Sequence, residues 1–280
     1  MNRRFLLRSI PFCFAICCIE LVACNPGNTT VVAQQTAESA ANKESVNQEA
    51  AKLLRAAGDA QNAGDYKLVL EKCKAVIELL PNDVRVQQRA AELMYLSGNA
   101  KESVPVFDKV IELLPEKAAE NWQRGIALAT VGDFKRGAEQ FKKHHDVNPD
   151  DVENSAWYYL CVAKSESVEA AKKTLIGSRG DRREPMMEIL KMLQGRSTPE
   201  QVLEAAEKSS PVPELKVRAK FYADLYIGLY YDSIGREEDA VKFFKRSLEQ
   251  GEQGYMADTA RVYLEHRFQK SKDSVPTAKP

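Results

Sequence analysis

A fixed interval between glycines, and between prolines, constrains the fold of this chain more than any other feature. Three glycines lie 34 residues apart, at Gly64, Gly98 and Gly132. Three prolines keep the same interval, at Pro81, Pro115 and Pro149. Two kinds of marker held at one period over three copies indicate a solenoid, in which similar short units stack and each unit contacts only its neighbours.

Each unit has the pattern of two helices joined by a turn. Apolar residues of the second unit recur at the three- and four-residue steps of one helix face, at Phe107, Val110, Ile111 and Leu114. In the third unit, Gly125 and Gly137 take the small positions where two helices cross closely, and Phe141 takes the aromatic position. These residues at a period of 34 match the tetratricopeptide pattern. The sequence therefore predicts an all-α solenoid of tetratricopeptide-type helical hairpins.

The repeats are predicted over residues 46–176, and an interruption follows them. The register is lost over residues 177–213, where two short helices are expected, at Pro185–Leu193 and Pro199–Lys208. Both begin with proline, which is a good first residue of a helix because its missing N–H is not needed there.

The pattern returns over residues 214–270 as a final repeat. Its last helix, Tyr255–Phe268, is expected to cap the stack, since a final hairpin otherwise exposes an apolar face. The polar residues 271–280 are predicted to form a disordered tail.

The first residues have the pattern of a secretory signal peptide. A basic start precedes a mostly apolar stretch, Ile10–Val22, which is too short to span a membrane. The stretch ends in Leu21–Cys24, which resembles the bacterial lipobox, whose cysteine is lipidated and becomes the first residue of the mature protein. We therefore predict a lipoprotein signal peptide at residues 1–23 and a lipid anchor on Cys24.

Two features qualify that prediction. Glu20 places a carboxylate inside the apolar stretch, so a plain signal peptide cleaved after Val31–Ala33, giving a soluble protein, is the alternative. Asn25 follows the cysteine, and by resemblance to enterobacterial sorting it favours the outer membrane. Residues 24–45 are mostly polar and lack apolar periodicity, and they are predicted to be a flexible tether.

Several parts of the chain are similar to the NlpI family of enterobacterial outer-membrane lipoproteins. The resemblance lies in the order of its parts and in four local stretches, Asn121–Leu128, Pro149–Asp151, Trp157–Leu160 and Phe221–Gly235. It implies a homodimeric adaptor, held at the outer membrane, that presents a periplasmic protease to peptidoglycan hydrolases. The chain departs from that family at Glu20 and in its weak first repeat.

The inner surface of a repeat array is lined by the first helix of each hairpin and is its usual binding surface. By resemblance to tetratricopeptide grooves, the exposed positions would be Arg85, Gln88, Glu92, Tyr95, Trp122 and Ile126. This mixture suits a partly apolar peptide or helix of a partner protein. The alternative is that these side chains face water or the neighbouring repeat.

Composition and motifs exclude several other functions. Lys+Arg and Asp+Glu number 40 each, so no basic excess points to nucleic acid. No HExxH, GxSxG, GxxxxGK[ST] or GxGxxG pattern occurs, and no catalytic residue, cofactor or metal is expected. Adjacent His144 and His145 lie on different helix faces and make a poor chelate. Cys73 and Cys161 are expected to be buried, unbridged thiols.

One further pattern leaves two interpretations. The basic run Arg179–Arg183 is either a solvated loop or a contact for an acidic partner. Taken together, the sequence favours a non-enzymatic, lipid-anchored envelope scaffold that binds proteins or peptides and faces the periplasm. The alternatives are a soluble periplasmic subunit of a secretion or outer-membrane assembly complex, and an enzyme whose site the motifs do not reveal.

Overall fold

The computed structural model describes residues 26–269, and every regular element within this range is helical. The predicted signal peptide, Cys24 and the predicted tail at residues 271–280 lie outside the described residues. The α-helices are α1 Pro26–Asn62, α2 Tyr66–Leu79, α3 Val84–Leu96, α4 Ala100–Leu113, α5 Trp122–Val131, α6 Phe134–Val147, α7 Val152–Ser165, α8 Val168–Thr174, α9 Met186–Leu193, α10 Pro199–Lys208, α11 Pro213–Ser233, α12 Glu237–Glu249 and α13 Tyr255–Leu264. Two short elements complete the set, the 3-10 helix η1 Pro115–Glu120 and the π-helix η2 Glu265–Gln269.

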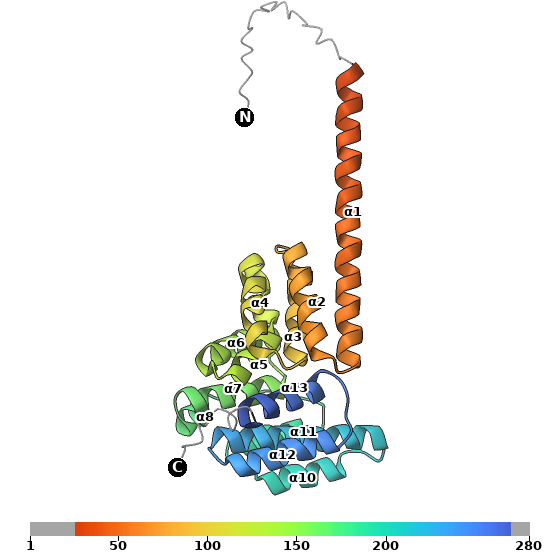
Figure 1. Cartoon of the computed structure of the whole chain (residues 1–280). Coiled ribbons are helices and arrows are strands. Elements are labelled where there is room, and N and C mark those ends of the chain that lie inside the picture. Colours follow the sequence, from red (N-terminus) through yellow and green to blue (C-terminus); the bar gives the residue numbers. More distant parts are fainter. Residues whose placement is uncertain (1–25, 270–280) are drawn as a thin grey trace, which may run out of the picture. The chain divides into compact units, whose positions relative to one another are not determined.

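Consecutive helices pack as antiparallel hairpins, and this confirms the predicted fold class. The pairs α3/α4, α5/α6, α7/α8 and α11/α12 each make extensive contact, and each hairpin also contacts the next along the array (Figure 1). Ala57 and Ala60 near the end of α1 are buried in one apolar cluster with Val69 and Cys73 of α2, so the first repeat has a core of its own. The chain therefore forms an all-α, tetratricopeptide-type solenoid.

The periodic glycines form the turns inside the hairpins, as the spacing predicts. Gly64, Gly98 and Gly132 have φ values of 74°, 80° and 87°, and Gly235 of the final repeat has 78°. Side chains disfavour this left-handed conformation, whereas glycine adopts it without steric cost. Each of these glycines therefore sits where the chain leaves one helix and begins the next.

A second glycine requirement comes from the close crossing of α5 and α6. A Cβ atom on Gly125 would lie 2.8 Å from the ring of Phe141. A Cβ atom on Gly137 would lie 2.8 Å from Sγ of Cys161, on α7. Both predicted small positions are therefore confirmed, because the Phe141 ring occupies the space beside Gly125 and the Cys161 sulfur occupies the space beside Gly137.

The interruption of the array consists of α9 and α10, as predicted. Thr198 and Gln201 form a capping box at the start of α10, and Pro199 is the first helical residue. Both helices contact α11, and α9 also contacts α7. They therefore extend the stack without continuing its 34-residue register.

The segment predicted to be a tether has regular structure where it is described. The described residues 26–45 and the residues from Val46 onward belong to separate units. Within the first unit, α1 begins at Pro26, so a helix forms in a segment whose sequence shows no apolar periodicity. Within it, Ala33, Ala37, Ala40 and Ala41 have high helix propensity, which favours a helix even without an apolar face. Its role as a tether stays a prediction.

The C-terminal helix differs in length and position from a simple end cap. The predicted single helix, Tyr255–Phe268, divides into α13 and η2 at Leu264. α13 packs on α12, as a capping helix should, and also contacts α3 and α5 of the earlier repeats. The end of the chain thus returns to the first helices of the array.

The two cysteines of the described residues are free and fully buried, as predicted. Cys73 lies in the core of the first repeat and Cys161 lies on α7, each with 0% exposure. Burial raises the pKa of the Cys73 thiol to about 12 and the pKa of Cys161 still further. Both thiols are therefore protonated, unreactive core groups.

Candidate protein-binding groove

The six residues predicted to line a binding groove do not share one environment. Arg85 is exposed, and Gln88, Glu92 and Trp122 are half-buried. Tyr95 and Ile126 are buried, with 0% and 1% exposure, so the prediction that they are exposed is wrong. The structure therefore divides the inner surface of the array into an open part and a covered part.

α13 covers the part that contains Tyr95. The ring of Tyr255 stacks on Tyr95 with centroids 6.3 Å apart and meets Trp122 edge-on at 4.9 Å. The hydroxyl of Tyr95 lies 3.1 Å from Oγ1 of Thr130, so its polar atom is satisfied inside the protein. Aromatic contacts of this kind add to the area that α13 buries on the inner surface.

A cation on α13 reinforces the same contact. Nη2 of Arg261 donates to the carbonyl oxygen of Leu96, at the end of α3, over 2.6 Å. The guanidinium also lies over the ring of Tyr66, on α2, at 4.9 Å from the centroid. The sequence contains one indication of this arrangement. α13 carries apolar residues on two sides, whereas a helix that only caps the end of an array needs one apolar side.

The open part is a groove formed by α3, the end of α4, η1 and the start of α5, which we call the open groove. Its volume is about 400 Å³. It is lined by Val84, Arg85, Gln88, Arg89, Glu92, Val110, Leu114, Lys117, Glu120, Asn121 and Gln123. Three of the six predicted residues, Arg85, Gln88 and Glu92, are among them.

A ladder of polar side chains connects α3 and α5 across the floor of the open groove. Asn121 caps α5 by accepting from the N–H of Arg124 at 3.2 Å, and its Nδ2 donates to Gln88 at 2.8 Å. Nε2 of Gln88 donates to Glu92 at 2.8 Å, and Nε2 of Gln123 donates to the same oxygen at 3.3 Å. The ladder fixes these side chains before any ligand arrives.

The charges of the open groove are mixed and paired. Arg89 lies 3.4 Å from Glu92, and Lys117 lies 2.7 Å from Glu120. Arg85 is the most exposed cation, with 93% of its side chain accessible and only a long 3.9 Å contact to Asp83. The surface therefore favours a partner with both polar and apolar groups over a strongly acidic or basic one.

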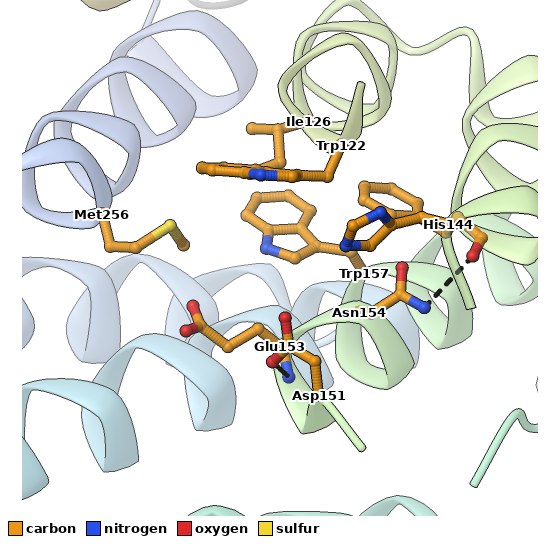
Figure 2. A pocket seen from close by; sticks show the side chains of 9 residues that line it. Trp122, Ile126, His144, Asp151, Glu153, Asn154, Trp157 and Met256 are labelled. Atoms are coloured by element: carbon orange, nitrogen blue, oxygen red, sulfur yellow. Dashed lines mark hydrogen bonds between the residues drawn. The ribbon is translucent and has the colours of Figure 1, made fainter. Parts of the chain in front are cut away.

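A small pocket lies where the covered part ends, and we call it the aromatic pocket. Its volume is about 90 Å³. It is lined by Trp122, Ile126, Phe141, His144, Asp151, Glu153, Asn154, Trp157 and Met256 (Figure 2). These residues come from α5, α6, α7 and α13, together with the residue that caps α7.

Burial separates the floor of the aromatic pocket from its rim. The floor residues Ile126, Phe141, His144, Asn154 and Trp157 are all buried. The rim residues Trp122, Asp151, Glu153 and Met256 are half-buried. Two polar atoms of buried floor residues, Nε1 of Trp157 and Oδ1 of Asn154, have no hydrogen-bond partner. The walls are thus aromatic, and the acidic groups stand at the opening.

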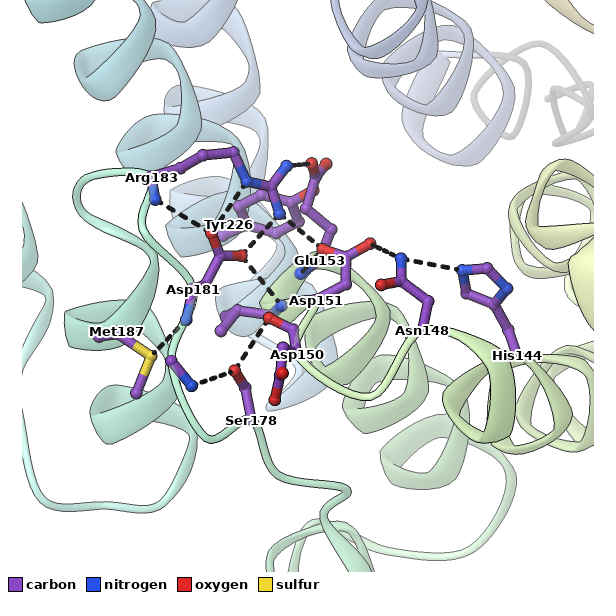
Figure 3. A network of polar contacts seen from close by, with 12 residues as sticks. His144, Asn148, Asp150, Asp151, Glu153, Ser178, Asp181, Arg183, Met187 and Tyr226 are labelled. Atoms are coloured by element: carbon purple, nitrogen blue, oxygen red, sulfur yellow. Dashed lines mark hydrogen bonds and ion pairs between the residues drawn. The ribbon is translucent and has the colours of Figure 1, made fainter.

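A network of charges lies behind this rim and joins α7 to α11 (Figure 3). The guanidinium of Arg183 pairs with Asp151 and Asp181, each at 2.6 Å, and with Glu153. Glu153 also accepts a hydrogen bond from the hydroxyl of Tyr226, on α11. The basic run Arg179–Arg183 therefore has contacts within the protein: Arg183, although exposed to solvent, pairs with three carboxyl groups of the chain itself.

The surroundings shift the pKa values of these carboxyl groups in opposite directions. Burial raises the pKa of Glu153 against the attraction of Arg183. Burial also works to raise the pKa of Asp181, but hydrogen bonds from Arg183 outweigh it and lower that pKa. The same guanidinium therefore contacts Glu153, whose pKa is raised, and Asp181, whose pKa is lowered.

The histidines have structural positions. His144 is buried, and its Nδ1 lies 2.9 Å from the carbonyl oxygen of Ala119, in η1. Within residues 26–269, no group of histidine, cysteine or acidic side chains has an arrangement that could hold a metal ion. In the same range, no helix is both long enough and apolar enough to cross a membrane.

The hairpins, their left-handed glycine turns and their close crossings define the class of this protein as a tetratricopeptide-type helical-repeat protein. No family model and no curated protein sequence matches the chain. Two solved structures are similar to it, MamA from residue 41 to its end from Desulfovibrio magneticus RS-1 and an ArsTM double mutant of RS-1 MamA. Each is 13% identical, with a TM-score of 0.43 over 72% of this chain and 95% or 94% of theirs. The assignment of the fold rests on the helices of this chain.

Proposed function

We propose that this protein is a non-enzymatic scaffold that binds partner proteins in the open groove. The observation that carries the proposal is the polar ladder of Gln88, Glu92, Asn121 and Gln123, which is held in place and faces a groove of about 400 Å³. Fixed donors and acceptors beside apolar walls lower the entropy cost of binding a peptide. Repeat arrays bind extended peptides or helices on this surface.

The neighbouring α13 supports a helical or extended partner segment. The inner surface already accepts one helix of the chain itself, through aromatic contacts and a single charged hydrogen bond to a backbone carbonyl. A partner segment in the open groove would lie alongside, with Val110 and Leu114 as apolar contacts and Arg85 available for an acidic group.

The proposal extends to the location of the protein. The lipobox-like Leu21–Cys24 supports a lipid on Cys24, and Asn25 supports the outer membrane with the array facing the periplasm. By resemblance to the NlpI family, the partners would include a periplasmic protease and peptidoglycan hydrolases, and the scaffold would be a homodimer. The anchor would then concentrate the scaffold and its partners at one membrane surface.

A charge-reversal pair tests the groove. Arg85→Glu changes an exposed residue of the open groove, and Lys101→Glu changes an exposed residue of α4 outside it, so both variants should fold normally. In affinity capture from bacterial envelope extract, Arg85→Glu should recover at least about ten-fold less partner than wild type, which corresponds to about 1.4 kcal/mol of binding free energy. Lys101→Glu should capture as much as wild type. Equal recovery by all three proteins would exclude the open groove as the binding site.

Separate measurements test the remaining parts of the proposal. Metabolic labelling with a palmitate analogue should mark the wild-type protein and not Cys24→Ala, and the absence of any label would favour the soluble alternative. Recovery of partners that include neither a protease nor a cell-wall hydrolase would reject the NlpI-type role while leaving the scaffold intact. Peptidase activity of the purified protein would contradict a non-enzymatic function.

A further inference from the structure

We propose that the aromatic pocket binds the cationic head group of a lysine or arginine side chain from the partner protein. The inference rests on the proposed scaffold function and specifies one contact within it. It follows from the aromatic walls, the charge of the rim, an unpaired acceptor on the floor, and the size of the pocket.

The walls supply the π faces that attract a cation. The chain contains two tryptophans, and both line this pocket, Trp122 at the rim and Trp157 at the floor. Figure 2 shows the two indoles facing the same space, with Met256 on one side. Phe141 stacks on Trp157 with centroids 6.3 Å apart, which fixes the floor indole in place. A cation above an indole face gains about 0.5–2 kcal/mol, the higher value when it is desolvated.

The rim carries an excess of negative charge. Asp151 and Glu153 stand at the opening, and Asp181 lies behind them. All three carboxyl groups pair with the single guanidinium of Arg183. The two carboxyl groups that line the pocket, Asp151 and Glu153, share this one guanidinium, which is not part of the lining, so they can attract the positive charge of a partner at the opening.

The floor holds an acceptor in a fixed orientation. Nδ2 of Asn154 donates to the carbonyl oxygen of Phe141 at 3.1 Å, so its Oδ1 points the other way, toward the aromatic side chains (Figure 2). That oxygen is buried and has no hydrogen-bond partner. An ammonium or guanidinium N–H would satisfy it, and the unpaired N–H of Trp157 would be left for a carbonyl oxygen of the same partner segment.

The size of the pocket indicates a side chain of a protein. About 90 Å³ is the space of about three water molecules, well below the roughly 300–1,000 Å³ of a small-molecule site. The rim residue Trp122 lies between Asn121 and Gln123, which line the open groove. A segment bound in that groove can therefore place one side chain in the aromatic pocket.

Tryptophan fluorescence tests the inference directly, because both tryptophans of the chain line the pocket. The probes are the peptides acetyl-Gly-Lys-Gly-amide and acetyl-Gly-Arg-Gly-amide, with acetyl-Gly-norleucine-Gly-amide as the uncharged probe of matched length. The cationic peptides should change the emission saturably and bind at least about five-fold more tightly than the norleucine peptide. Equal binding of the norleucine peptide would mean an apolar anchor pocket and would overturn the inference.

A variant pair keeps the test independent of folding defects. Met256→Lys places a cation of the chain itself at the rim, and this should abolish binding of the cationic peptides. Met256→Leu keeps the apolar character and should bind them like wild type. Far-UV circular dichroism checks that both variants are folded, and unchanged lysine-peptide binding by Met256→Lys would show that the site lies elsewhere. If the wild-type protein captures a partner but binds none of the cationic peptides, this inference alone is rejected, whereas a wild-type protein that captures no partner rejects the scaffold function.

Discussion

The rings of Tyr95 and Tyr255 stack with their centroids 6.3 Å apart, although 160 positions separate the two residues in the chain. The contact joins the first helix of the second repeat to the C-terminal helix. α13 therefore occupies part of the inner surface that a repeat array normally offers to partners. The open groove and the aromatic pocket are the parts of that surface that α13 leaves accessible.

Two tyrosines of α13 should respond differently to loss of their hydroxyl groups. The hydroxyl of Tyr263 donates to Asp232 at 2.6 Å in a buried site, so Tyr263→Phe should cost about 1.5–3 kcal/mol of unfolding free energy. The hydroxyl of Tyr255 is buried without a partner, so Tyr255→Phe removes an unsatisfied polar group and should leave the stability unchanged or raise it by up to about 1 kcal/mol. Urea unfolding followed by circular dichroism measures both values. Equal losses would mean that Tyr255 has a polar partner.

Arg183 should be the most sensitive position of the loop before α9. Arg183→Ala leaves Asp151, Glu153 and Asp181 together without their cation, and because 40% of the Arg183 side chain is exposed to solvent, it should cost about 1–2 kcal/mol at pH 7. Arg179 pairs with Asp150 at the surface, with 83% of its side chain exposed, so Arg179→Ala should cost less than about 1 kcal/mol. Urea unfolding compares the two variants, and similar small losses would mean that the buried network contributes little to stability.

The same network makes the stability of the folded protein depend on pH. Burial raises the pKa of Glu153 in the folded state, so between its ordinary value and this raised value the folded protein holds a proton that the unfolded chain has lost. This group therefore lowers the stability as the pH rises through that window. In Arg183→Ala the guanidinium no longer lowers the pKa of Glu153, so that pKa rises further. Acidification from pH 7 toward 5 should therefore recover part of the lost stability. A variant equally unstable at both pH values would contradict this account.

The repeat period predicted the hairpins well because the features that encode it are local. A left-handed turn requires glycine wherever it occurs, and a helix crossing requires a small residue beside an aromatic one. Gly132 and the pair Gly125 and Phe141 were therefore assigned correctly from their spacing alone. The helix from Pro26 was missed because helix-forming composition, without an apolar face, gives no periodic signal.

The site was predicted less completely because it depends on distant segments. Within their own repeats, Tyr95 and Ile126 match positions that are exposed in a groove. The surface they belong to is covered by α13, which follows more than 120 residues later in the chain. Part of the polar ladder could have been predicted from the sequence, because Gln88 and Asn121 lie 33 residues apart, which is close to one period. Side chains one period apart on first helices face each other, so polar pairs at this spacing are candidates for such contacts.

Two helical glycines should respond in opposite ways to alanine. A Cβ at Gly125 would meet the Phe141 ring at 2.8 Å, so Gly125→Ala should destabilise the protein by about 1–3 kcal/mol. A Cβ at Gly58, in α1, would have no neighbour within 4 Å, so Gly58→Ala should stabilise the helix by about 0.5–1 kcal/mol. Thermal unfolding compares the two variants. A stable Gly125→Ala protein would show that the crossing of α5 and α6 tolerates a wider separation.

Loss of Arg261 should loosen α13 while the repeats stay folded. Its guanidinium donates to the carbonyl oxygen of Leu96 at 2.6 Å and pairs with Asp258 at 3.2 Å, so Arg261→Ala removes a charged hydrogen bond worth about 1.5–3 kcal/mol. Because every 1.4 kcal/mol is a factor of ten, amide exchange over residues 255–264 should accelerate at least about ten-fold. The control is Arg218→Ala. It removes an ion pair with Glu252 at 3.1 Å, but 54% of the Arg218 side chain is exposed, so this exchange should stay unchanged. Faster exchange throughout α3 and α12 as well would mean that α13 unfolds only together with the whole array.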